Sequence, residues 1–576
     1  MEKKPKRIGV YICHCGGNIS DYVDVEKVRQ AVDGGDAEIV VMAKTTMFAC
    51  SDANQRDMVE DIKANNLDSV VVASCSPKLH QLTFRNVSVR ADLNKYTYVH
   101  ANIREQASWA HSDNKMGATE KAIHLVKAAI AKSKYAEALE TNKIKAKKAV
   151  AVIGAGVAGI KAAISLAEKD TEVILIEKEP FVGGRVAQWG SLFSTNETGK
   201  EMIDRLSADM SKYKNITLLT NSEVIDNKGS VGNISLKVRT NSDGNEKITE
   251  LVVGSVLMAT GFDYYTPEDG EFGYGTSNKI ITLPVFKNMI DNQKGKLIHN
   301  GSEVKNIAYI YCVGSRQTDG ENTYCSRNCC TSTIHAAVTA KQKFGDITNY
   351  HFNRGLRTYG KQEILYADSL RQGDIYLQSY EDGLPTVVTE GKKTIVKIND
   401  ILTNGREIEV EADLVVLVTG MVPRSDNSSI GSLFKLPKGR DKFYNEVHMK
   451  LRPVETVIDG ITIAGACQGP KNIAESVNSA LSASTKSYSI LSKGELETDP
   501  LIAVIDPEKC TWCGACEAAC PFDAILKVEN GKKVIAEINN SVCKGCGMCT
   551  PVCEPDAIDL IACSSKEIMS MIDALV

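Results

Sequence analysis

Cysteine is the residue type in this sequence whose number and spacing point most directly to chemistry. The chain has 18 cysteines, and sixteen of them fall into four groups of four, with Cys467 and Cys563 outside the groups. The chain is too long for a small disulfide-stabilised secreted domain, and its basic N-terminus leads straight into an apolar segment without a signal-peptide cleavage site. In a reducing compartment such clustered thiols are more often metal ligands, so we expect four metal-binding groups.

Two of the groups lie near the end of the sequence and share the spacing C-x2-C-x2-C-x3-C. This spacing is typical of bacterial two-cluster ferredoxins, in which three cysteines of a run bind one [4Fe-4S] cluster and the fourth binds the other. Zinc is the alternative, but a doubled run with crossover spacing favours clusters. We therefore predict an electron-carrying module with one cluster on Cys510, Cys513, Cys516 and Cys553, and one on Cys543, Cys546, Cys549 and Cys520.

A glycine-rich segment, KKAVAVIGAGVAGIKAAISLAEKDTEVILIEKEP, predicts a strand, a tight turn, a helix and a second strand. Gly154, Gly156 and Gly159 form the G-x-G-x-x-G motif, whose glycines let the backbone approach a pyrophosphate at the helix N-terminus. Glu177 ends the second strand, where an acidic residue accepts hydrogen bonds from ribose hydroxyls. The complete pattern predicts a dinucleotide-binding domain.

Later segments favour FAD over NAD as the dinucleotide. FVGGRVAQ, VLMATGFD, VVLVTGMVPR and GITIAGACQGPKNIAES resemble, in order, motifs of flavoproteins with two dinucleotide-binding domains. The alternative is a structural Rossmann domain without a ligand. Besides the motif glycines and Glu177, the expected FAD-binding residues are Gly183, Gly184, Arg185, Val224, Thr260, Gly261, Gly465 and Ala466.

The third cysteine group lies where a second nucleotide-binding loop is expected. In the thioredoxin-reductase architecture that these motifs resemble, residues 265–410 form a domain for NAD(P)H. Here its first strand, NIAYIYCVG, runs into Cys312 without a glycine triplet, so we expect that nucleotide site to be lost. Cys325, Cys329 and Cys330 follow, and with Cys312 they could bind a [4Fe-4S] cluster beside the flavin. A vicinal disulfide between Cys329 and Cys330, or reduced buried thiols, are the alternatives.

The fourth group belongs to an N-terminal segment of alternating strands and helices. RIGVYIC, EIVVMA, DSVVVASC and YTYVH read as parallel strands, and Cys13, Cys15, Cys50 and Cys75 lie at or just beyond strand ends. Loops at the carboxyl edge of such a sheet converge, so these four thiols are candidate ligands of a further [4Fe-4S] cluster. Because no CxxC run occurs here, incidental thiols in a small α/β domain stay an alternative.

The bulk properties describe a large multidomain α/β protein. A chain of 576 residues exceeds a single hydrophobic core. A net charge of −4 argues against nucleic-acid binding, and no run of eighteen apolar residues suggests a membrane span, so we expect a cytoplasmic protein. The predicted domains are an α/β domain at 1–140, an FAD-binding domain at 148–264 and 411–490, a degenerate NAD-like domain at 265–410 and an α+β ferredoxin domain at 498–576.

Taken together, the motifs resemble the heterodisulfide reductase A component over nearly the whole chain. The segments that carry the resemblance include VYICHCGGNISDYVDV, VVASCSPKLH, YCVGSR, YCSRNCC, GACQGPKNI and the ferredoxin runs. The resemblance implies a flavin and iron–sulfur oxidoreductase component, usually homodimeric, with B and C partner subunits. Its implied electron donor is a small iron–sulfur, dehydrogenase or hydrogenase protein. It also implies that Cys312, Cys325, Cys329 and Cys330 bind a cluster close to FAD, which raises the expected number of clusters to four.

His335 is the candidate catalytic residue on the same resemblance. Relatives commonly carry a lysine five residues after the adjacent cysteines, near the flavin, and this chain has His335 there. A neutral imidazole stabilises an anionic reduced flavin less than an ammonium group does, which weakens the case for the electron bifurcation known in the family. The alternative functions are an NAD(P)H-dependent flavin disulfide reductase with an appended ferredoxin domain and a non-catalytic scaffold with structural FAD.

Overall fold

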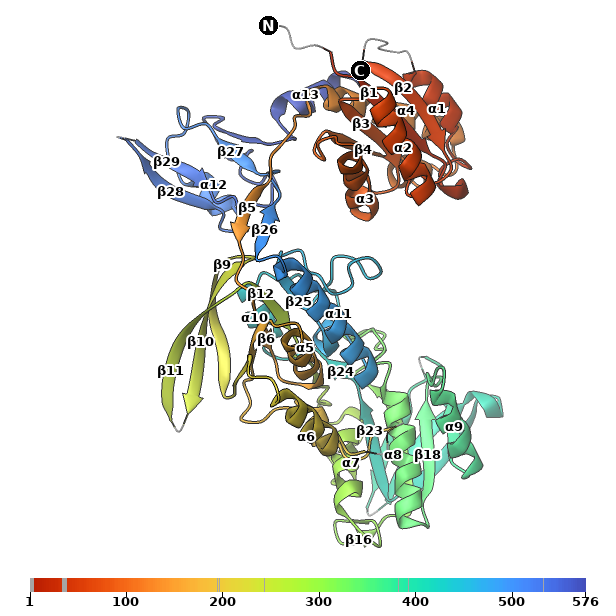
Figure 1. Ribbon diagram of the computed structural model, residues 1–576. Helices are drawn as coiled ribbons and strands as arrows, with labels where there is room; N and C mark the ends of the chain where they lie inside the picture. Colours follow the sequence, from red (N-terminus) through yellow and green to blue (C-terminus); the bar gives the residue numbers. More distant parts are fainter. Residues whose placement is uncertain are drawn as a thin grey trace. The chain divides into compact units, whose positions relative to one another are not determined.

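The computed structural model describes residues 5–33, 39–193, 195, 197–242, 244–381, 383–391, 393–531 and 533–575. The chain divides into two compact units, residues 1–143 with 497–576 and residues 144–496, and each is described by itself. The short strands β5 (Asn142–Lys145) and β26 (Glu495–Thr498) lie where the chain passes between the units (Figure 1).

The N-terminal part of the first unit is a parallel sheet with strand order β2-β1-β3-β4. The apolar runs of β1 and β3 are buried along their whole length, as expected for central parallel strands covered by helices. All four predicted strands are confirmed. The elements are β1 (Ile8–Cys13), α1 (Val25–Val32), β2 (Val40–Thr46), α2 (Asp52–Ala64), β3 (Ser69–Ser74), α3 (Pro77–Arg90), β4 (Tyr98–Asn102), the π-helical turn η2 (Arg104–Ser108) and α4 (Lys115–Tyr135).

The C-terminal part of the first unit consists of two antiparallel strand pairs, β27 with β30 and β28 with β29. Its last helix, α13, begins with a reciprocal cap between Ser564 and Glu567, and its Ser570 Oγ lies 3.3 Å from the carbonyl oxygen of Ala131 on α4. The elements are β27 (Ala503–Ile505), α12 (Ala515–Ala519), β28 (Ile525–Asn530), β29 (Lys533–Ile538), β30 (Ile558–Leu560) and α13 (Ser565–Asp573).

The second unit begins with a three-layered domain around a five-stranded parallel sheet, β25-β12-β6-β7-β8. Apolar residues of α5, α6 and α11 cover one face, and an antiparallel sheet of β9, β10 and β11 covers the other. The elements are β6 (Ala149–Ile153), α5 (Val157–Ala167), β7 (Glu172–Ile176), α6 (Gly199–Met210), β8 (Ile216–Leu219), β9 (Ser222–Ser230), β10 (Asn233–Ser242), β11 (Asn245–Val253), β12 (Ser255–Met258), β25 (Ile461–Ile463) and α11 (Ile473–Leu491).

A second parallel sheet, β14-β23-β17-β18-β19, is inserted between β12 and β25. Helices α7 and α8 lie against one face (Figure 1), and the antiparallel sheet β20-β21-β22 covers the other. The chain leaves and re-enters the first domain through the antiparallel pair β13 (Asp263–Tyr264) and β24 (Met421–Val422). The remaining elements are β14 (Ile280–Thr282), α7 (Leu283–Asn292), β15 (Ile298–His299), β16 (Ser302–Glu303), β17 (Asn306–Val313), α8 (Cys329–Phe344), β18 (Thr348–Asn353), α9 (Gln362–Arg371), β19 (Ile375–Gln378), β20 (Thr386–Glu390), β21 (Lys393–Asp400), β22 (Arg406–Ala412), β23 (Leu414–Thr419) and α10 (Asn427–Leu433).

Candidate cofactor sites

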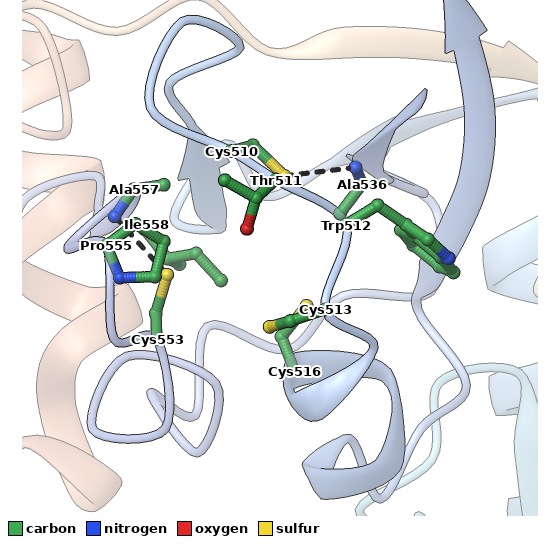
Figure 2. A pocket seen from close by; sticks show the side chains of 10 residues that line it. All are labelled: Cys510, Thr511, Trp512, Cys513, Cys516, Ala536, Cys553, Pro555, Ala557 and Ile558. Atoms are coloured by element: carbon green, nitrogen blue, oxygen red, sulfur yellow. Dashed lines mark hydrogen bonds between the residues drawn. The ribbon is translucent and has the colours of Figure 1, made fainter. Parts of the chain in front are cut away.

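The two C-terminal cysteine runs line two separate small cavities, and each cavity combines both runs. Figure 2 shows the first, where Cys510, Cys513 and Cys516 of one run face Cys553 of the other. The second is lined by Cys520 of the first run together with Cys543, Cys546 and Cys549. The structure therefore groups these eight residues in the crossed arrangement that the spacing predicts.

Backbone N–H groups point at the cysteine sulfurs in both cavities. The amide of Ala536 donates to Cys510 Sγ (3.4 Å) and that of Ala557 to Cys553 Sγ (3.3 Å), as the dashed lines in Figure 2 mark. In the second cavity the amide of Ala524 donates to Cys520 Sγ (3.3 Å). Such bonds favour sulfur in its anionic, ligand form.

The donor sets suit a group larger than one metal ion. Among the described residues, no three His, Cys, Asp or Glu side chains are grouped closely enough to hold a single ion. A zinc site needs its sulfurs within about 2.3 Å of one metal. A [4Fe-4S] cluster instead takes four cysteine thiolates and occupies the space between them, which is the arrangement of the two cavities.

A cavity of about 900 Å³ lies in the second unit at the carboxyl end of the sheet β25-β12-β6-β7-β8. Its volume is at the upper end of the range for small-molecule sites, as a dinucleotide requires. Its wall includes the turn after β6, the N-terminus of α5 and the first turn of α11. Ten predicted residues line it: Gly154, Gly156, Glu177, Gly183, Gly184, Arg185, Val224, Thr260, Gly261 and Ala466.

The other two predicted FAD-binding residues, Gly159 and Gly465, lie behind this wall. A Cβ on Gly159 would stand 1.8 Å from the carbonyl oxygen of Gly154, so only glycine lets α5 approach the turn. Gly465 has a φ of +73°, and a Cβ there would stand 2.9 Å from that of Ala158. Both glycines shape the cavity through backbone packing.

Glu177 holds the glycine turn in place from the end of β7. Its carboxylate is buried and accepts hydrogen bonds from the amides of Ala155 (2.6 Å) and Glu179 (2.9 Å). On the opposite wall, the buried Thr260 Oγ1 has no hydrogen-bond partner in the described part of the chain. An unpartnered hydroxyl lining a cavity of this size fits a polar ligand such as FAD.

Lys471 is a cavity residue that the sequence reasoning missed. It lines the wall beside Asn472 and Ile473, and its Nζ donates to Gln468 Oε1 at 3.0 Å. Burial lowers the pKa of the Lys471 ammonium group. A lysine inside the closing motif GACQGPKNI was the signal that could have identified it.

Cys312, Cys325, Cys329 and Cys330 are brought together at one end of β17 and α8. Burial raises the pKa of Cys312, and the nearby thiols of Cys330 and Cys325 raise it further. A hydrogen bond from the Cys329 thiol lowers the pKa of Cys330 to about 7. Both adjacent cysteines are free thiols, without the disulfide of the alternative prediction.

Two buried arginines lie beside this group. The side chains of Arg316 and Arg354 are only 12% and 6% exposed, and both pair with the carboxylate of Glu381. Their charges lower the pKa of Cys312, and the buried Nε of Arg354 has no partner among the described residues. Two guanidinium groups sharing one carboxylate suit a neighbouring site that carries negative charge.

The N-terminal cysteines also meet at one edge of their sheet. The amides of Cys15 (3.3 Å) and Ala49 (3.4 Å) donate to Cys13 Sγ. Burial raises the pKa of Cys13, with Cys15 and Cys50 adding to the increase. Burial likewise raises the pKa of Cys75 to about 11, with Cys15 and Cys13 contributing. The four predicted ligands are therefore neighbours.

Arg104 supplies positive charge to the N-terminal group. Its Nη1 lies 3.7 Å from Cys15 Sγ, and its charge acts to lower the pKa of Cys75. It extends from η2, the π-helical turn after β4.

His335 is not among the residues that line the dinucleotide cavity. It lies on α8, with its ring edge-on to Phe193 at 5.9 Å between ring centres. Burial lowers the pKa of His335 to about 4, and the charge of Lys287 contributes. Lys287 Nζ in turn lies 5.8 Å from the ring centre of Trp189, which does line the cavity. The histidine is thus neutral near pH 7.

Comparison with known proteins assigns the chain to a family. Residues 148–289 match the profile "Pyridine nucleotide-disulphide oxidoreductase", and residues 502–554 match "4Fe-4S dicluster domain". The second iron–sulfur A component of the CoB–CoM heterodisulfide reductase of Methanopyrus kandleri is 35% identical over 93% of this chain and 93% of its own length. The chain belongs to the heterodisulfide reductase A family.

Other members of the heterodisulfide reductase A family are similarly close. The A component of the H2:CoB–CoM heterodisulfide,ferredoxin reductase of Methanothermobacter marburgensis is 34% identical over 92% of this chain and 91% of its own. Among solved structures, thioredoxin reductase of T. acidophilum aligns with 59% of this chain and 97% of its own at 18% identity and a TM-score of 0.41, too low to support any argument.

The predicted fold class, the oxidoreductase class and the cofactors FAD and [4Fe-4S] clusters are confirmed by the two profiles and by family membership. Within the described ranges, no helix combines the length and the apolar character needed to cross a membrane.

Proposed function

We propose that the chain is the electron-transfer component of a heterodisulfide-reductase-like complex, passing electrons between a donor partner, FAD and four [4Fe-4S] clusters. The observation that carries the proposal is the combination, in one chain, of a dinucleotide-sized cavity with four groups of four neighbouring cysteines. When bound, FAD accepts electrons in pairs and each cluster carries one, so a cluster near the flavin allows a pair to be divided.

The roles of the chain's own residues follow from their positions. The turn at Gly154 and Gly156 offers backbone N–H groups at the N-terminus of α5, where a pyrophosphate is stabilised. Glu177 orients that turn and accepts from the ribose, and Arg316 and Arg354 offset negative charge at the Cys312 group. All sixteen grouped cysteines act as cluster ligands in this proposal.

The loop after β17 argues against NAD(P)H as the direct reductant. The strand ends in Cys312 with a φ of +63°, and its pairing with β23 shifts register between Ile310 and Val313. A Cβ on Gly314 would stand 2.0 Å from the ring of Tyr265, so this ring covers the glycine. Backbone of this kind does not present the open glycine turn that a nucleotide phosphate needs.

The relatives' names describe complexes with several subunits and acceptors. The protein from Methanothermobacter marburgensis is named for H2, the CoB–CoM heterodisulfide and ferredoxin. For this chain we propose a homodimer that binds B and C subunits and receives electrons from a small iron–sulfur, dehydrogenase or hydrogenase protein. Its cytoplasmic location remains a prediction.

A protein donor tests the function directly. Oxygen-free holoprotein is mixed with a reduced bacterial ferredoxin, which is too large to enter the FAD cavity, and bleaching of the flavin absorbance is followed. We expect bleaching in the wild type and at least about tenfold slower bleaching in Cys543→Ser/Cys546→Ser, because one ferredoxin cluster is lost. A flavin that dithionite reduces but ferredoxin never does would contradict the proposal and support the scaffold alternative.

A further inference from the structure

Arg327 connects the cysteine loop of the second domain to the segment that closes the dinucleotide cavity. Its backbone amide donates to Cys325 Sγ at 3.3 Å. Its guanidinium group reaches the other domain, where Nη2 lies 2.5 Å from Glu475 Oε1 and Nη1 donates to the carbonyl oxygen of Pro470 at 3.4 Å. One residue therefore contacts both sites.

The partners of Arg327 belong to the cavity wall. Asn472 lines the cavity, directly before the start of α11. Glu475 Oε2 accepts from the amide of Asn472 at 3.0 Å, while the Asn472 side chain accepts from the amide of Glu475 at 2.8 Å. The carboxylate that holds Arg327 thus also fixes this turn of the wall, so displacing one disturbs the other.

The backbone of Arg327 supports a functional reading of this link. Its φ is +59°, in the left-handed region that glycine adopts without steric cost. Cys312 and Arg316 in the same loop have φ values of +63° and +54°. Strained positions concentrate at functional sites, where the surrounding contacts maintain them. Tyr359 adds to these contacts, because its hydroxyl lies 3.3 Å from both Arg327 Nη2 and Glu475 Oε1.

We infer that Arg327 is a positioning residue that couples the two cofactor sites, by fixing the turn at Cys325 against the wall of the FAD cavity. Ordering of the cysteine loop then strengthens FAD binding, and FAD binding strengthens the loop to the same degree, because such coupling is reciprocal. This inference rests on the proposed function, in which Cys325 is a cluster ligand.

A double-mutant cycle on the full chain tests the coupling. The FAD dissociation constant is measured by flavin fluorescence for the wild type, Cys325→Ser, Arg327→Ala and the double variant, all prepared without oxygen. We expect Cys325→Ser to weaken FAD binding about fivefold or more when Arg327 is present, and less than about twofold when it is alanine. Equal effects in the two backgrounds would overturn the inference.

Further variants separate coupling from folding. Arg371→Ala removes another exposed arginine, paired with Asp368 on α9, and must leave the coupling intact. Glu475→Gln removes the charge that holds Arg327, so it must reduce the coupling even if Arg327→Ala fails to fold. Full coupling in Glu475→Gln would also overturn the inference.

The iron content distinguishes this inference from the proposed function. Cys325→Ser must lose about four irons per chain if Cys325 is a cluster ligand. Unchanged iron would contradict the proposed cluster, whereas lost iron with equal FAD effects in both backgrounds would contradict only the role of Arg327.

Discussion

Glu177 combines two tasks at the residue scale, since its carboxylate accepts from the amides of Ala155 and Glu179 and faces the dinucleotide cavity. Glu177→Ala leaves the buried Ala155 amide without its charged acceptor and removes the ribose contact. We expect FAD affinity to fall about tenfold or more, measured by flavin fluorescence.

Glu172→Ala on the same strand is the matched control for Glu177→Ala. Glu172 is exposed, at the start of β7, and pairs at the surface with Lys147. Its loss should leave FAD affinity unchanged, and equal losses in the two variants would count against a ligand role for Glu177.

His335 makes stability dependent on pH. Its pKa is lowered from 6.5 to about 4, chiefly by burial, so the unfolded chain binds its proton more readily than the folded chain. The stability this residue contributes is present above pH 6.5 and is lost as the pH falls towards 4, at most roughly 3 kcal/mol. In calorimetry of the apoprotein, His335→Gln should lose less stability over this range than the wild type.

The exposed His124 provides the control for the pH prediction. His124→Gln should follow the wild type across the same pH range. If His335→Gln also follows the wild type, its imidazole is not held neutral by burial.

At the scale of elements, the cap of α11 belongs to the helix and to the cavity at once. Asn472→Ala removes a side-chain acceptor for the Glu475 amide, which should cost about 1 kcal/mol of stability. Because Asn472 also lines the cavity, we expect FAD affinity to fall in parallel. Ser564→Ala removes the equivalent cap of α13. It should cost similar stability without changing FAD affinity, and a loss of FAD affinity there would contradict this assignment.

The elements that the sequence predicted best are those with a period or a fixed spacing. The buried runs of β1 and β3, and the strand-turn-helix from β6 to α5, follow from apolar patterning and glycine chemistry. The antiparallel sheets β9-β10-β11 and β20-β21-β22 were not predicted, because their strands are half exposed and their pairing is set by the parallel sheets that they cover.

Site residues divide in the same way. The cysteines and motif glycines carry their spacing in the sequence, so ten of the expected FAD residues line the cavity. Lys471, Arg327 and Arg354 have no motif, and only the approach of distant segments shows their positions. His335 lies outside the lining because its helix faces Phe193 instead.

At the scale of the whole molecule, the two ends of the chain share one unit and the dinucleotide cavity lies entirely in the other. Residues 144–496 contain their own apolar cores and should fold alone. We expect this fragment to bind about one FAD and about four irons, measured by absorbance and metal analysis. A fragment that binds FAD without iron would show that the Cys312 group is not a cluster site.

The most direct test of the whole account is the iron and flavin content of the full chain purified without oxygen. We predict about sixteen irons and about one FAD per chain, corresponding to four [4Fe-4S] clusters on the four cysteine groups. About eight irons with one FAD would leave only the two ferredoxin clusters, and would contradict the continuous electron path through the chain.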